Sequence, residues 1–264
     1  MFNFAAVIGI AKHTGLKAVI PQDTLLQAHF NFTPIPEVNY TQAFQGAVRL
    51  HEKRAGIFTP SVFHQAKCRN TSVLLKGYLQ SWKYFALAKS DVITAFRFKA
   101  EIEQQASDVV TRLKQEQKSS STPPLLVGIH VRRGDYVREK NYKDGRRIAP
   151  PDYYPKAMRY FTDKFPNKRV IFVVCSDDLQ WCKNLTKFVE FDVRLMSKHN
   201  SPGLDLAILS KCDHTIMSVG TFGWWAGYLA NGTTVYYKDW LEPNTYIGDK
   251  YNDEDFFPPE WIAM

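Results

Sequence analysis

The sequence predicts an α/β protein whose second half is built on a parallel β-sheet with helices on both faces. Three observations carry this prediction. Short apolar runs alternate with helical patterns from residue 125 onward, an order typical of parallel sheets. The first run, 125–131, is apolar along its length, as in strands buried on both sides. A Ser- and Pro-rich stretch at 119–124 indicates a linker between two domains.

The N-terminal half is predicted to mix helices with a short strand. Residues 2–14 form a helical pattern, and 17–20 form a strand that Pro21 would end. Residues 100–117 combine polar side chains with apolar ones spaced near 3.6, which predicts a helix directly before the linker. The expected domains are 1–118 and 125–264, joined by the linker 119–124.

The second half supplies the elements of the sheet in order. Four apolar runs predict strands at 125–131, 169–175, 214–218 and 233–237. Four helical patterns predict helices at 153–165, 179–188, 204–211 and 222–229, the first with Asp152 as its N-cap. Ligands of such sheets bind beyond the carboxyl ends of the strands. The polar clusters that follow the strands are therefore the candidate site.

Composition limits the class of protein without choosing a ligand. Of the 264 residues, 45% are hydrophobic and 23% charged, which rules out a mainly disordered chain. Lys and Arg exceed Asp and Glu by 34 − 26 = 8, and the pI is about 9.2. This excess is consistent with an anionic ligand: nucleic acid, a membrane surface or a phosphorylated small molecule. No membrane-spanning run or signal peptide is visible, which alone would indicate a cytosolic protein.

Glycosylation sequons point instead to the secretory lumen. Five sequons of the form Asn-x-Ser/Thr occur, more than chance would place, at Asn31, Asn39, Asn70, Asn184 and Asn231. The four cysteines permit one or two disulfide bridges and are equally consistent with buried free thiols.

The first polar cluster follows the strand at 125–131 and contains His130, Arg132, Arg133, Gly134 and Asp135. Arginine offers a planar fork of donors that matches phosphate oxygens. Glycine would let the backbone approach a ligand closely, and Asp135 would hold one arginine in place. The alternative is a surface loop with a salt bridge. The Arg-Gly-Asp triplet also matches the integrin-recognition tripeptide, but it abuts a buried strand rather than lying in a mobile loop.

Two further clusters follow later strands. Asp177 and Asp178 would accept hydrogen bonds from a ribose or a base, although Ser176 or Asp177 would also serve as a helix cap. Ser218, Thr221 and Phe222 lie in a turn that resembles a phosphate-binding helix N-terminus, or an ordinary cap. Asp205 begins another helix, where it would at least interact with the helix dipole.

Several common sites are excluded. The chain has no Gly-x-x-x-x-Gly-Lys-Ser/Thr loop, no His-Glu-x-x-His or Cys-x-x-Cys pair and no Gly-x-Ser-x-Gly elbow. These absences argue against a P-loop nucleotidase, a zinc site of these types and an esterase. One Asp-Asp pair is a weak metal signal, so no metal site is expected.

The segment from His130 to Tyr136 resembles the His-x-Arg-Arg-Gly-Asp-Tyr signature of the α1,2-fucosyltransferases. Other family-like blocks follow in family order over nearly the whole chain: 77–85, 175–178 with 181–182, 212–217, 220–226 and 259–262. Together these blocks are far more specific than any one of them. The resemblance is closest to the animal galactoside 2-α-L-fucosyltransferases.

The resemblance implies a GT-B-like fold of two Rossmann-type domains with mainly parallel sheets. It implies an inverting, metal-independent transfer of L-fucose from GDP-fucose to the 2-hydroxyl of a terminal β-galactose, without a further cofactor. The C-terminal domain would bind the donor and the N-terminal one would lie on the acceptor side. The implied setting is the lumenal side of the Golgi membrane.

The resemblance also implies roles for the candidate residues. Arg132 and Arg133 would face the pyrophosphate, with His130 supporting the same site. Asp177 and Asp178 would contact the guanosine, and the turn with Ser218, Thr221 and Phe222 the phosphates. Arg132 would act in catalysis by stabilising the departing GDP, and Asp135 and Asp205 are the candidates for the base.

One departure from the family pattern lies at the start of the chain. Family members carry a Gly-x-Leu-Gly-Asn-Gln stretch directly before the segment that residues 1–4 resemble. We therefore expect an N-terminal domain incomplete at its start, and a membrane anchor and stem that are absent from this sequence.

Two other functions remain open at this point. An inactive relative would bind glycan or nucleotide without transfer, and a transfer assay would separate it from the enzyme. A nucleic-acid binder is suggested by the charge alone and would show steeply salt-dependent binding to any polyanion. The resemblance predicts GDP-fucose and a β-galactoside glycan as partners, and no nucleic acid.

Overall fold

The chain divides into two compact units. The computed structural model describes residues 1–22, 24–32, 35–39, 41, 44–68, 71–116, 122–187 and 191–264. Unit 1 comprises Met1–Lys99 and Asp249–Pro259, and unit 2 comprises Ala100–Gly248 and Glu260–Met264. The first division falls at Lys99, earlier than the predicted linker, because helix α5 (Ala100–Gln115) packs along α9 (Pro202–Ser210) of unit 2. Residues 117–121, which include half of the predicted linker, lie outside the described residues.

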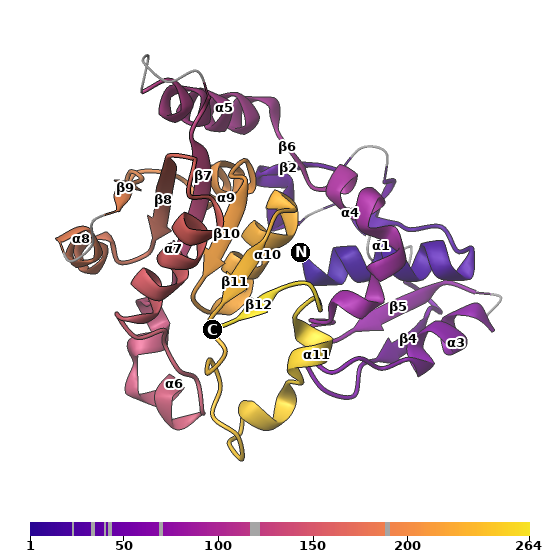
Figure 1. The fold of residues 1–264 in the computed structure, drawn as a ribbon. Helices are drawn as coiled ribbons and strands as arrows, with labels where there is room; N and C mark the ends of the chain where they lie inside the picture. Colours follow the sequence, from indigo (N-terminus) through magenta and orange to yellow (C-terminus); the bar gives the residue numbers. More distant parts are fainter. Residues whose placement is uncertain are drawn as a thin grey trace. The chain divides into compact units, whose positions relative to one another are not determined.

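Unit 2 contains a six-stranded sheet in the order β12-β11-β10-β7-β8-β9, in which every pair is parallel (Figure 1). Its strands are β7 (Leu125–Val131), β8 (Val170–Ser176), β9 (Asp192–Leu195), β10 (His214–Met217), β11 (Thr234–Tyr236) and β12 (Ile262–Ala263). The chain runs outward from β7 through β8 and β9, then returns to β10 on the other side of β7. The strand order therefore reverses between β7 and β10, which is where such sheets bind ligands.

Successive side chains of β7 point to opposite faces of the sheet, and their contacts show which helices cover each face. The remaining helical elements of unit 2 are η4 (Gly134–Val137), α6 (Glu139–Lys143), α7 (Tyr153–Lys164), α8 (Leu179–Lys187), α9 (Pro202–Ser210) and α10 (Gly220–Ala230), with η5 (Gly248–Lys250) at the division between the units. Ile129 belongs to a buried apolar cluster with residues of α7 and α8. Gly128 points to the opposite face, where a Cβ atom would lie 2.9 Å from Leu209 of α9.

The predicted elements of unit 2 are confirmed with shifts of one or two residues at their ends. Strands β9 and β12 were not predicted from the sequence. Both are short strands at the edges of the sheet; β9 is only half-buried along its length, so neither shows the apolar run of a central strand. Asp152 is the residue before α7, as predicted, but its carboxylate pairs with Lys156 instead of capping the helix.

In its described residues, unit 1 has three two-stranded sheets, of which β1–β3 and β4–β5 are parallel and β2–β6 is antiparallel. Its strands are β1 (Ile20–Pro21), β2 (Phe30–Asn31), β3 (Glu37–Val38), β4 (Val48–His51), β5 (Val73–Lys76) and β6 (Arg97–Phe98). Its helices are α1 (Phe2–Thr14), η1 (Leu25–Ala28), α3 (Ser61–Lys67), η2 (Trp82–Tyr84), η3 (Ala86–Ala88), α4 (Lys89–Ala95) and α11 (Asp253–Phe256). Helix α1 has the predicted bounds, whereas the strand predicted at 17–20 is confined to β1 and includes Pro21.

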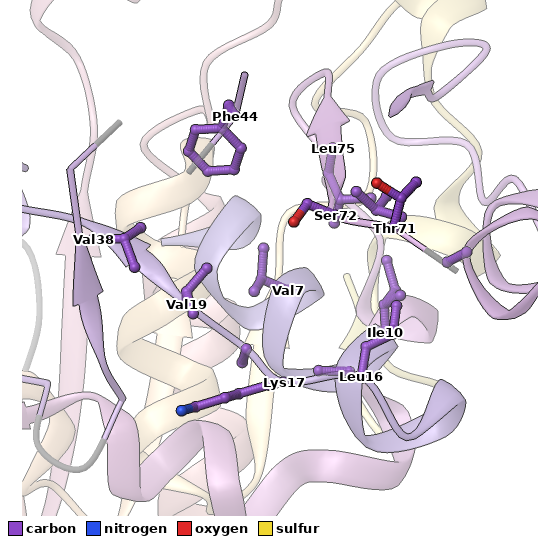
Figure 2. A pocket seen from close by; sticks show the side chains of 14 residues that line it. Val7, Ile10, Leu16, Lys17, Val19, Val38, Phe44, Thr71, Ser72 and Leu75 are labelled. Carbon is purple, nitrogen blue, oxygen red and sulfur yellow. The ribbon is translucent and has the colours of Figure 1, made fainter. Parts of the chain in front are cut away.

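A cavity of about 540 Å³ separates the two parallel strand pairs of unit 1 (Figure 2). Val38 of β3 and Val19 lie on one side, Leu75 of β5 on the other, and Val7 and Ile10 of α1 form the base. In the described part of the unit, β1 pairs only with β3 and β5 only with β4. The strands of this unit therefore do not join into one continuous sheet.

The segment Asp249–Pro259 returns to unit 1 and closes its core. Phe256 is buried and its ring lies 6.1 Å from that of Phe2 at the start of α1. Asp255 accepts a hydrogen bond from the backbone N–H of Phe58 at 2.8 Å and pairs with Lys83 at 2.6 Å. Residues at the two ends of the chain thus belong to one core.

All four cysteine thiols are free. Cys68 is exposed, whereas Cys175, Cys182 and Cys212 are buried. Of the two alternatives from the sequence, the structure has the free thiols. Among the described helices, none combines the length and apolar character that a bilayer crossing requires.

A test of the unit 2 core uses two tyrosines on one helix. The buried phenol of Tyr153 donates to the backbone oxygen of Met217 at 2.8 Å and so ties α7 to β10. We expect Tyr153→Phe to lower the free energy of unfolding by about 1 kcal/mol, the typical value of a lost hydrogen bond. The matched control is Tyr160→Phe, whose hydroxyl accepts an exposed hydrogen bond from Lys164 Nζ at 3.1 Å. Urea titration with equal losses in both variants would show that this contact does not stabilise the unit.

Candidate functional site

The candidate site lies beyond the carboxyl ends of β7, β8 and β10, at the reversal of strand order. Register places His130 of β7 beside Cys175 of β8 and Met217 of β10. The residues that follow these three strands therefore emerge side by side. The structure brings together three of the sequence-predicted clusters at this edge.

Arg132 lies at the centre of the cluster. Its Nη1 contacts Asp177 Oδ2 at 2.6 Å, and its Nη2 forms an ion pair with Asp135. Its backbone N–H donates to Ser218 Oγ at 2.8 Å. Two of the five N–H donors of the guanidinium are used in this way. The others remain for a ligand, and about a third of the side chain is exposed.

Arg133 is held by the two aspartates after β8. Its backbone N–H donates to Asp177 Oδ1 at 2.9 Å, and its Nε donates to Asp178 Oδ2 at 3.1 Å. The guanidinium carbon lies 4.3 Å from the centre of the Trp181 ring, a cation–π distance. Asp177 therefore binds both arginines, one through the side chain and one through the backbone.

Gly134 is required here for a reason other than the predicted one. We expected the glycine to let the backbone approach a ligand, but a Cβ atom at this position would lie 2.4 Å from Asp177 Oδ2. The space above Gly134 is filled by the carboxylate that holds Arg132. The glycine thus permits the ion pair.

The start of α8 is capped by Asp178, and not by Ser176 or Asp177 as predicted. Asp178 Oδ1 accepts the backbone N–H of Trp181 at 3.0 Å, and Ser176 Oγ accepts that of Asp178 at 2.9 Å. The pKa of Asp178 is lowered mainly by the hydrogen bond from the Trp181 backbone and to a smaller extent by the bond from Arg133. Asp178 thus combines the helix cap with a bond to the Arg133 side chain, whereas both oxygens of Asp177 bind the arginines.

Ser218 and His130 are buried beneath the arginines. Ser218 is 1% exposed, and its hydroxyl accepts the backbone N–H of Arg132 at 2.8 Å. In the structure this hydroxyl supports Arg132 from below. The His130 ring lies 4.7 Å from the Phe222 ring, and its Nδ1 has no hydrogen-bond partner. Burial lowers the pKa of His130 to about 4, so the ring is neutral near pH 7.

Helix α10 begins beside this cluster with its N-terminal amides uncapped by any side chain. Gly220 has a φ of 83°, which favours glycine, and Gly223 leaves room for His130 Nδ1, 2.9 Å from where a Cβ would stand. Thr221 is exposed and Phe222 half-buried at this terminus. Free amides and the helix dipole together favour an anion at such a position.

Asp205 does not take part in the arginine network. It lies in the first turn of α9, which Ser201 caps by accepting the Leu204 N–H at 3.1 Å. Its carboxylate accepts from Asn200 Nδ2 at 2.8 Å. Burial is the main cause that raises its pKa, against the opposing bond from Asn200. The two candidates for the base thus differ: Asp135 is ion-paired, and Asp205 is partly desolvated.

The sequence analysis assigned no site role to Trp181, Tyr136, Asn141 or Arg146. Trp181 stacks on Arg133, and Tyr136 lies beside Arg132. Asn141 lies in α6, and Arg146 follows this helix. Neither residue lies at the end of a strand, where the sequence pattern predicted site residues. A cation–aromatic pair spaced across separate elements leaves no local pattern. Trp181 and Tyr136 carried a signal only as parts of family-like blocks.

The predicted glycosylation asparagines are at the surface where the structure describes them. Asn31, Asn39, Asn184 and Asn231 are all exposed, while Asn70 lies outside the described residues. Among the described residues, no group of three or more His, Cys, Asp or Glu side chains is placed to hold a metal ion.

Sequence comparisons match one family over most of the chain. The model of Glycosyl transferase family 11 matches residues 62–264. Galactoside alpha-(1,2)-fucosyltransferase 1 of Saimiri boliviensis boliviensis is 30% identical over 271 residues, covering 100% of this chain and 71% of the relative. Galactoside alpha-(1,2)-fucosyltransferase 2 of Bos taurus is 30% identical over 274 residues, covering 100% and 75%.

Solved fucosyltransferases have a similar fold. POFUT1 in complex with GDP has a TM-score of 0.51 at 12% identity, with 89% of this chain and 93% of that chain covered. NodZ from Bradyrhizobium has a TM-score of 0.52 at 14% identity, with 85% and 87% covered. These likenesses confirm the predicted GT-B-like α/β fold class.

The buried His130 predicts a pH dependence of stability. Because its pKa is about 4 when folded and about 6.5 when unfolded, the unfolded chain binds more protons between these values. This contribution to stability is therefore full above pH 6.5 and is lost as the pH falls toward 4, by up to about 3 kcal/mol. His130→Leu should show a shallower loss over this window in unfolding titrations, whereas the control His199→Gln, at an exposed histidine, should keep the wild-type slope. Parallel slopes for wild type and His130→Leu would contradict the assignment.

Proposed function

This chain belongs to glycosyl transferase family 11, and we propose that it transfers L-fucose from GDP-fucose to the 2-hydroxyl of a terminal β-galactose. The proposal includes inversion at the anomeric carbon and no metal ion. The observation that carries it is the pair Arg132 and Arg133, held by carboxylates beside the uncapped start of α10. Fixed cations and free amides at a strand-order reversal suit a nucleoside diphosphate.

The reaction needs one bond to form and one to break at the sugar. The acceptor 2-hydroxyl oxygen attacks C1 of fucose, and the bond from C1 to the phosphate oxygen breaks. GDP leaves with the electron pair, and the hydroxyl proton passes to a base. Negative charge grows on the leaving phosphate, so the unused donors of Arg132 stabilise the transition state more than the ground state.

The surrounding residues have supporting roles in this proposal. Arg133 binds the diphosphate with Arg132, and the start of α10 at Thr221 and Phe222 receives a phosphate. Ser218 and His130 support the backbone and wall of the site from below. Asp177 and Asp178 position the arginines, and their partly exposed side chains are proposed to contact the guanosine. The N–H groups of the arginines that the carboxylates leave unused stabilise the departing diphosphate by hydrogen bonding, so the proposal needs no metal.

The base is proposed from the two carboxylates that the sequence indicated. Asp135 is bound by Arg132, and an ion-paired carboxylate is a weaker proton acceptor. Burial raises the pKa of Asp205, the direction that a general base at neutral pH requires. We therefore place Asp205 ahead of Asp135 for this role.

The division of labour and the cellular setting are part of the same proposal. Unit 2 carries the donor site, and unit 1 lies on the acceptor side. Exposed sequon asparagines at positions 31, 39, 184 and 231 suit an enzyme of the Golgi lumen. The named relatives act, by their names, on galactosides, which supports a β-galactoside glycan as the acceptor.

Nucleotide binding without metal is the first test. A thermal melt of the purified chain with GDP, UDP or ADP in EDTA should show a rise with GDP alone. Binding to the native state at a hundredfold excess over Kd adds about 2.7 kcal/mol to stability. Equal rises with all three nucleotides, or none, would contradict a guanosine-selective donor site. Binding of GDP with no transfer to a β-galactoside would favour an inactive relative.

The role of Arg132 predicts a loss of rate on a conservative change. Arg132→Lys keeps the charge, but one ammonium group does not reproduce the planar fork, so we expect kcat to fall by about a hundredfold. The matched control is Arg138→Lys, an exposed arginine shortly after the same turn, which should transfer fucose at the wild-type rate. Rates of fucose transfer measured for both variants give the comparison. A near-normal rate for Arg132→Lys would contradict the proposed contact between Arg132 and the phosphate.

A further inference from the structure

The turn that carries Asp135 is held from behind by Asn141. Asp135 and Tyr136 lie in η4 (Gly134–Val137), directly after Arg132 and Arg133. The side-chain amide of Asn141 donates to the backbone oxygen of Asp135 at 2.5 Å. The position of the Asp135 carboxylate, and so of its ion pair with Arg132, depends on this bond.

One guanidinium joins Asn141 to Tyr136. Arg146 Nη1 donates to Asn141 Oδ1 at 2.9 Å, and the Arg146 backbone N–H donates to the Asn141 carbonyl at 3.0 Å. The Arg146 guanidinium also lies against the Tyr136 ring. Asp144 lies 3.6 Å from Arg146 Nη1 and supplies its counter-charge. Arg146 is therefore held by the Asn141 amide and the Asp144 carboxylate, with the Tyr136 ring beside it.

Tyr136 carries the second route from Arg146 to Arg132. The guanidinium carbons of Arg132 and Arg146 each lie 5.9 Å from the centre of the Tyr136 ring. Burial is the main cause that raises the pKa of this phenol, so it is protonated and polar at neutral pH. Arg146 thus reaches Arg132 through Asn141 and Asp135, and again across the aromatic ring.

We propose that Arg146 is a positioning residue that sets the orientation of the Arg132 guanidinium for the leaving diphosphate. The inference rests on the proposed function and extends it to a residue outside the strand ends. Arg146 acts through Asn141, Tyr136 and Asp135 and needs no contact with the donor. Small displacements of a group that stabilises a transition state lower the rate steeply.

The test compares Arg146→Lys with Arg147→Lys in the full chain. Lysine keeps the charge at position 146, but a single Nζ does not replace a planar fork that bonds Asn141 and also lies against the Tyr136 ring. We expect kcat to fall about tenfold, with a smaller change in KM for GDP-fucose and a melting temperature near that of the wild type. Arg147 stacks on Tyr142 at 3.8 Å and pairs with Glu242 instead, so Arg147→Lys should retain the wild-type kcat.

A double-mutant cycle with Arg132→Lys separates positioning from a merely structural role. If Arg146 acts through Arg132, the loss in kcat for the double variant will be smaller than the product of the two single losses. Multiplicative losses, or equal rates for Arg146→Lys and Arg147→Lys, would overturn the inference. Asn141→Ala provides a second variant of the same route should Arg146→Lys fail to fold, and wild-type kcat in that variant would overturn it as well.

Failure of the proposed function has a separate signature. A wild-type chain that neither binds GDP nor transfers fucose would remove the proposed reaction, and this inference with it. A wild-type chain that does both, while Arg146→Lys does so equally well, would remove the inference alone.

Discussion

The carboxylate of Asp177 is the contact on which the candidate site depends. One oxygen binds the side chain of Arg132 and the other binds the backbone N–H of Arg133. A single group after β8 thereby sets the path of the chain after β7, because it fixes consecutive residues at once. Gly134 is glycine because this carboxylate occupies the space that any side chain there would need.

The balance of charge follows from the same arrangement. Two guanidinium groups face three carboxylates, Asp135, Asp177 and Asp178. An overall excess of positive charge in the chain is therefore not concentrated in bare cations at this edge. The carboxylates orient the two arginines and neutralise their charge locally. A diphosphate would therefore be recognised by the direction of the remaining N–H groups of the arginines and by the backbone amides at the start of α10. Such a site favours a bidentate ligand of matching shape over a generic polyanion.

Much of unit 2 followed from the sequence, because β7, β8, β10 and β11 are mostly apolar runs and the helices α7, α8, α9 and α10 between them show a helical pattern. The polar clusters at the strand ends were found for the same reason: parallel strands bring their carboxyl ends to one edge. The division of tasks between Asp177 and Asp178 was not foreseeable, since adjacent carboxylates are equivalent in the sequence and only the path of Arg133 separates them. Asn141 and Arg146 were missed because their partners lie across a turn and have no periodicity. The two-stranded sheets of unit 1 are too short to give a pattern.

The three crossings of the chain between the units bear on how the protein is made. Asp249–Pro259 follows nearly the whole of unit 2 in the sequence, yet Phe256 and Asp255 complete the core of unit 1. During synthesis, residues 1–99 leave the ribosome long before this segment exists. Domains that are continuous in sequence fold one after another as they emerge, whereas here the aromatic core of unit 1 lacks Phe256 until residues 249–259 have been made. Nearly all of unit 2 is thus synthesised before the core of unit 1 is complete.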